Sequence, residues 1–149
     1  MSEIDNDKAF RTALEALGID RQRVVGALFV DHVLDLSDDA RVAQALAAAR
    51  EPKIADEALE LARRSIKAAS LEAHTRCGAD GEWTEQAGYF VARAAEVCVE
   101  PEGRSRSLAW KAAMNARMAR TCLAADSEED THDSESRAQY QILTRYLDA

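Results

Sequence analysis

The sequence predicts an all-α protein, folded as a single-domain bundle of six or seven helices. Alanine is the commonest residue, proline occurs only at positions 52 and 101, and no long stretch alternates apolar and polar residues as a strand would. Apolar residues instead recur at intervals of three and four. With 149 residues, the chain has the usual length of one domain and can bury one core without disulfides or metals.

The first two helices are predicted over residues 10–17 and 20–36. Gly18 follows the first apolar stripe, where a left-handed C-cap residue would stand. Asp20 is the expected N-cap of the second helix. His32 lies on the apolar stripe of that helix, which favours a neutral core histidine with one hydrogen-bond partner over a catalytic group.

The third and fourth helices have clear start and stop signals. Ser37 or Asp38 is expected to cap a short helix over 40–50, which ends before Pro52 because proline disfavours helical geometry in the residue before it. Asp56 opens a longer helix that reaches the breaker GADG at 78–81. His74, near its end, is expected to contact terminal carbonyls or a carboxylate.

The last three helices are predicted over 83–98, over about 105–124, and around 142–147. Trp83 and Trp110 are expected to be core or helix-packing residues, and Pro101 ends the first of these helices. The middle helix has an inner face built largely of alanine, which allows close packing against its neighbours. The final amphipathic helix is expected to anchor this end of the domain.

An acidic connector is predicted over 126–135, DSEEDTHDSE, before the last helix. Six of its ten residues are acidic and none is Lys or Arg, while the whole chain has 27 Asp and Glu, 19 Lys and Arg, and a net charge of −8. A calcium loop starting at Asp126 would need glycine and glutamate where Thr131 and Arg137 stand. The acidic residues are expected to meet a basic protein partner, with a merely solvated connector as the alternative. They are Asp126, Glu128, Glu129, Asp130, Asp133 and Glu135, with Asp35, Asp38 and Asp39 as a second patch.

Composition also limits the location and the other partners. Acidic chains are poor ligands for nucleic acids or anionic membranes, which need clustered lysine and arginine. The N-terminal residues MSEIDNDKAF resemble no signal peptide, and no apolar run is long enough to span a membrane. Three cysteines without metal-ligand spacing are expected to be small buried residues in a reducing cytoplasm. No cofactor or metal is predicted.

Two other classes of function stay open. One is a small helical metalloenzyme that uses His32, His74 and His132 with nearby carboxylates, although the ExxH spacing of Glu129 and His132 occurs only once. The other is a helical regulator without catalytic activity, such as a phage or defence protein that imitates the charge of nucleic acid. Bound metal would favour the first, and two spaced rows of acids on one face would favour the second.

Three segments resemble a bacterial family of all-α immunity proteins encoded beside polymorphic toxins. They are HVLDLSDDARVAQALAAAR at 32–50, ADEALELARRSIKAASLEAH at 55–74 and SRAQYQILTRYL at 136–147. They are similar to the family's acidic turn before a helix, its alanine-rich helix that ends in histidine, and its closing helix with a central glutamine. The resemblance implies a cytoplasmic, non-enzymatic protein that binds a toxin and blocks it. Together with the localised carboxylates, it favours a basic toxin such as a nuclease.

Overall fold

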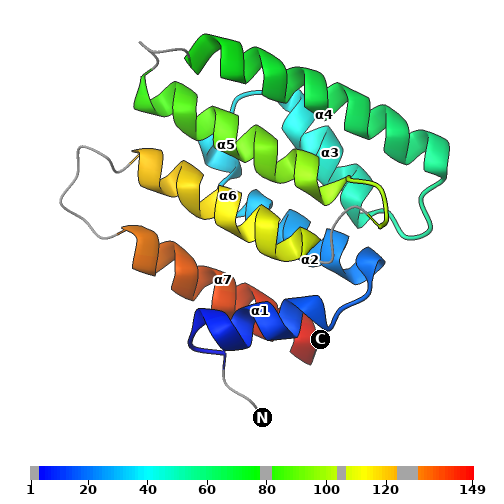
Figure 1. Ribbon diagram of the computed structural model, residues 1–149, viewed down its shortest axis with the longest axis vertical. Coiled ribbons are helices and arrows are strands. Elements are labelled where there is room, and N and C mark those ends of the chain that lie inside the picture. The colour runs from blue at the N-terminus through cyan, green and yellow to red at the C-terminus, as the bar shows by residue number, and fades with distance from the viewer. Residues whose placement is uncertain (1–3, 78–81, 104–106, 124–130) are drawn as a thin grey trace.

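The computed structural model describes residues 4–77, 82–103, 107–123 and 131–149, and these residues form an all-helical domain (Figure 1). The predicted fold class is confirmed. The described chain contains seven α-helices and one short 3₁₀ helix: α1 (Asp7–Glu15), α2 (Ile19–Asp31), η1 (Leu34–Leu36), α3 (Ala40–Arg50), α4 (Asp56–Cys77), α5 (Trp83–Cys98), α6 (Leu108–Leu123) and α7 (Thr131–Asp148).

Helix α6 occupies the centre of the bundle. It packs against α5, α2, α7 and α1, while α4 packs against α5 and α3 on the far side (Figure 1). Helices α4 and α7 thus lie at opposite edges. The alanines on the inner face of α6 explain this position, because Ala109, Ala112, Ala113 and Ala116 are fully buried and let neighbouring backbones approach closely.

A glycine on α2 shows how close this approach is. A Cβ atom added to Gly26 would lie 3.2 Å from Cys98 Sγ on α5 and 3.4 Å from Ala112 Cβ on α6. The small side chain therefore lets α2 lie against both helices. Cys98 and Cys122 are buried free thiols, as expected for small apolar residues.

The core has two parts. The larger part joins α2, α3, α4, α5 and α6, and the smaller part surrounds Phe10 between α1, α2, α6 and α7. Phe10 is fully buried, with its ring centroid 5.5 Å from that of Phe29 and 5.2 Å from that of Tyr140. Trp110 packs on the smaller part as well, as expected, whereas Trp83 is 46% exposed and is therefore not a core residue.

A buried arginine crosses the smaller core. Arg117 of α6 is 2% exposed and donates two hydrogen bonds, of 3.0 and 2.9 Å, to the Asp7 carboxylate on α1. Its Nε donates to Gln139 Oε1 at 2.8 Å, and the Gln139 amide donates to the carbonyl of Ala113 at 2.9 Å. Because Gln139 is fully buried, this chain of bonds fixes α1, α6 and α7 relative to one another.

Several predicted helix ends were wrong. Gly18 is the N-cap of α2 in an extended conformation, so Asp20 lies in the first turn of α2 and not at its cap. The chain leaves α1 through a bond from the Leu17 N–H to the Leu14 carbonyl and needs no left-handed residue there. The second helix stops at Asp31, five residues before the predicted end, because η1 tightens the chain into a turn.

Helix α7 begins earlier than predicted, at Thr131, so half of the predicted connector 126–135 belongs to the helix. The acidic residues of 131–135 therefore lie at a helix N-terminus, where the macrodipole favours negative charge. No helix in the described part of the chain combines the length and the apolar character of a membrane span.

Candidate functional site

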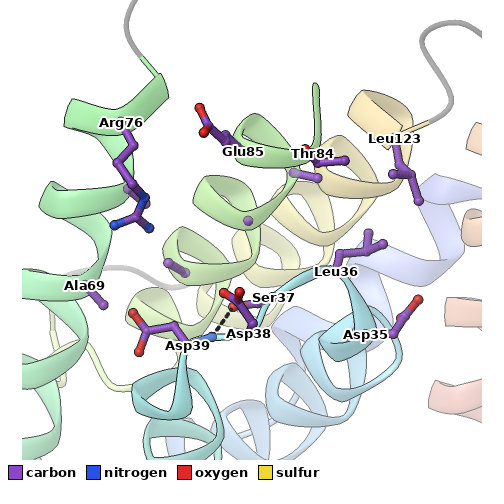
Figure 2. A pocket seen from close by; sticks show the side chains of 14 residues that line it. Asp35, Leu36, Ser37, Asp38, Asp39, Ala69, Arg76, Thr84, Glu85 and Leu123 are labelled. Atoms are coloured by element: carbon purple, nitrogen blue, oxygen red, sulfur yellow. Dashed lines mark hydrogen bonds between the residues drawn. The ribbon is translucent and has the colours of Figure 1, made fainter. Parts of the chain in front are cut away.

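A pocket lies between the η1–α3 turn, α4, α5 and the end of α6, and we call it the large pocket. Its volume is about 810 Å³ (Figure 2). Small and apolar side chains form much of its lining: Leu36, Ala69, Ala73, Ala87 and Ala92. Polar and charged side chains surround them: Asp35, Asp38, Asp39, Arg76, Thr84 and Glu85.

The turn before α3 places three aspartates along one side of this pocket. Ser37 Oγ accepts a hydrogen bond from the backbone N–H of Asp39 at 3.2 Å, drawn as a dashed line in Figure 2. Asp39 then caps α3 by accepting from the N–H of Arg41 at 2.9 Å, so the predicted cap at Ser37 or Asp38 was wrong by one or two residues. The turn thereby leaves Asp38 exposed between two fixed neighbours.

Asp39 differs from the other two aspartates because its charge is already paired. Arg41 donates from Nε at 3.0 Å and from Nη2 at 2.8 Å to the Asp39 carboxylate, and it also forms an ion pair with Glu72 of α4. These bonds from Arg41 hold the pKa of Asp39 below its usual value. Asp39 is therefore the N-cap of α3, and its charge is largely neutralised by Arg41 and not available to a partner.

Asp35 and Asp38 are more exposed than Asp39 and less paired within the chain. The Asp35 side chain is 67% exposed and touches Arg120 only at 3.5 Å. Asp38 is exposed and forms no hydrogen bond or ion pair with another described residue. Glu85, in the first turn of α5, adds an exposed carboxylate, and Arg76 of α4 is the cation across the pocket. Figure 2 shows Arg76 and Glu85 at the end of the pocket away from the aspartates.

The structure tests only a small part of the predicted connector surface. Asp126, Glu128, Glu129 and Asp130 lie outside the described residues, as does the side chain of Asp133.

Glu135 is described, and it is 3% exposed. Its Oε2 lies 2.7 Å from His32 Nδ1, and its Oε1 accepts from Arg120 Nε at 3.3 Å. The prediction that Glu135 faces a partner is therefore wrong, because its carboxylate holds α7 against α2 and α6.

The histidines also differ from expectation. His32 is the C-cap of α2 with a side chain 44% exposed, so it is not a core residue, although it has the one partner predicted. His74 lies beside Tyr89, with ring centroids 5.4 Å apart, and it forms no hydrogen bond or ion pair with another described residue. The side chain of His132 does not belong to the described part of the structure. Within the described ranges, no three His, Cys, Asp or Glu side chains come together as a metal site would require.

A second hollow lies between α2 and α7. It has a volume of about 460 Å³ and is lined mainly by Leu28, Asp31, His32, Ile142, Arg145 and Tyr146. The sequence pointed to neither this groove nor the roles of Glu85 and Arg76 in the larger pocket. Periodicity along one helix does not report which exposed residues of two helices face the same hollow.

Comparisons with protein-family models, curated proteins and solved structures found no match to this chain.

Proposed function

We propose that this chain is an immunity protein, which binds a cognate bacterial toxin and neutralises it through protein–protein contact. The observation that carries the proposal is the large pocket, whose apolar lining is bordered by exposed Asp35 and Asp38 at one end and by exposed Glu85 at the other. Negative charge attracts and orients a basic partner, while buried apolar contact supplies most of the affinity. The resemblance of residues 32–50, 55–74 and 136–147 to the immunity family supports the same role.

The charge balance favours a basic toxin, such as a nuclease. Nuclease surfaces that bind phosphates are positive, and an acidic protein with a net charge of −8 can cover such a surface. Internal pairing already explains Asp39 and Glu135. It does not explain Asp38, which has no partner in the described structure. Asp35 has only a long contact of 3.5 Å with Arg120 and stays 67% exposed.

The first experiment is co-expression of the chain with the product of the adjacent gene, followed by purification through a tag on one of them. We expect the two proteins to elute as one complex and the toxic activity of the neighbour to disappear in that complex. If the neighbour's product inhibits growth and the chain neither binds it nor restores growth, the proposal is wrong.

The second experiment measures association rates at low and high salt for the triple variant Asp35→Asn, Asp38→Asn and Glu85→Gln. Loss of the steering charge should slow association about tenfold at low salt and flatten its salt dependence. A matched control removes three exposed carboxylates elsewhere: Glu51, Glu57 and Glu102. Equal slowing in both variants would show a general effect of net charge, and an unchanged rate in the first would exclude this pocket as the steering surface.

A further inference from the structure

The groove between α2 and α7 has the composition of an anchor site for an apolar side chain. Leu28 on α2 and Ile142 and Tyr146 on α7 line it, and all three are partly exposed. Its volume of about 460 Å³ is at the lower end of the range for small-ligand pockets, and it is large enough for an aromatic side chain. In protein interfaces, the side chains that dominate affinity fill pockets that lose their water when the partner binds.

Two walls of the groove are fixed by contacts within the chain. His32 is held through its Nδ1 by Glu135 at 2.7 Å, and the buried Glu135 is held in turn by Arg120 at 3.3 Å. Tyr146 accepts a hydrogen bond from Arg21 Nε at 3.3 Å, and the Arg21 guanidinium lies 5.2 Å from the centroid of its ring. Because these side chains are already ordered, an incoming group loses little free energy to their immobilisation.

The charges at the edges of the groove have opposite signs. Asp31 is on the α2 side and Arg145 on the α7 side, and both are exposed without a hydrogen-bond or ion-pair partner among the described residues. Beyond Asp31, the chain continues through η1 to Asp35 and Asp38 of the large pocket. One segment, 31–39, therefore borders both hollows: Asp31 and His32 line the groove, and residues 35–39 line the large pocket.

We propose that this groove takes one large apolar or aromatic side chain of a protein partner, flanked by lysine or arginine residues that meet Asp31 and Asp35. The inference rests on the proposed function and adds to it the apolar anchor of the interface. The negative charges of Asp31, on the α2 side of the groove, and of Asp35, in η1, favour a basic occupant. A second copy of the chain would bring another protein of net charge −8 against the same acidic edge.

The test uses synthetic peptides in place of the toxin, so it does not depend on which partner the chain has. One peptide has a tryptophan flanked by two lysines on each side, and its control has glycine in place of tryptophan. Binding is followed through backbone amide shifts in NMR spectra of the ¹⁵N-labelled full chain. We expect the tryptophan peptide to shift the amides of Leu28, His32, Ile142 and Tyr146, and the glycine peptide to bind about tenfold more weakly.

Two exposed positions give charge variants that should fold. Asp31→Lys should weaken binding of the tryptophan peptide about tenfold, whereas Arg145→Glu should strengthen it. Glu57→Lys, on α4 at the opposite edge of the bundle, is the matched control and should change little (Figure 1). Thermal unfolding of each variant checks that the fold is kept.

Three results would overturn the inference. The first is equal affinity for the tryptophan and glycine peptides, and the second is a set of shifts confined to residues 35–39 and 85. The third is concentration-dependent self-association of the free chain that Ile142→Ala reduces, which would make the groove an interface between copies. The second result would leave the proposed function standing, whereas failure of co-purification with a toxin would leave the groove as a site for another basic protein.

Discussion

Replacing Arg117 by methionine should destabilise the smaller core by about 3 kcal/mol. The variant keeps the apolar stem that packs near Phe10 and Trp110, but it loses the charged bonds to Asp7 and Gln139. Asp7 is 48% exposed and can return to water, whereas Gln139 is fully buried and keeps an unsatisfied oxygen at a cost of about 1–3 kcal/mol. The expected total is therefore at the lower end of the roughly 3–5 kcal/mol for breaking a fully buried pair.

The assay is urea unfolding at pH 7, followed by circular dichroism and, separately, by tryptophan fluorescence. In a separate thermal scan, the melting temperature should fall by about 6–12 °C, at about 2–4 °C per kcal/mol for a domain of this size. Arg64→Met is the matched control, since the side chain of Arg64 is 72% exposed in its pair with Glu60, and its effect should stay below about 0.5 kcal/mol. A loss of less than about 1 kcal/mol for the Arg117 variant would refute the view that this arginine joins α1, α6 and α7.

Two further predictions follow from shifted pKa values. Burial raises the pKa of the Cys98 thiol to about 12, so at pH 8 only about one molecule in 10⁴ holds the thiolate. Iodoacetamide should therefore label Cys98 only after denaturation, as read by peptide mass spectrometry, and rapid labelling of the native chain would contradict its enclosed position. Arg41 lowers the pKa of Asp39 in the folded chain below its ordinary value of 3.8. The Asp39 carboxylate therefore stabilises the fold above pH 3.8, and this stabilisation is lost as the pH falls through the lowered pKa. Asp39→Asn should reduce the acid-induced loss of stability below about pH 4, and parallel pH profiles of the two proteins would argue against this role of the Asp39 charge.

The helices could be predicted because the signals for helix formation are local. The α3 bounds, Ala40–Arg50, agree with the prediction, since Asp39 caps the first turn and Pro52 excludes a longer helix. The breaker at 78–81 likewise separates α4 from α5. Errors occurred where two local signals competed: Gly18 could end one helix or begin the next, and the acids of 131–135 could remain a loop or favour a helix N-terminus.

The functional surfaces were harder to predict because charge in the sequence does not reveal its partner in space. Glu135 looked like one more carboxylate of an acidic run, but the fold brings it onto His32, 103 residues away. The sequence predicts a patch of Asp35, Asp38 and Asp39, yet only the contacts of Arg41 distinguish the paired Asp39 from the exposed Asp38. Glu85 and Arg76, which complete the pocket, carried no local signal.

The sequence by itself determined that this chain is a helical bundle, where most helices begin and end, and that its negative charge gathers in two segments. Apolar period, caps and breakers act within a few residues, so they can be read along the chain. Only the tertiary structure decided which charged side chains form ion pairs within the chain, which remain exposed, and where two hollows border the segment 31–39. The physical reason is that burial and ion pairing depend on how α2, α4, α5, α6 and α7 pack, and this packing joins residues that are far apart in the chain.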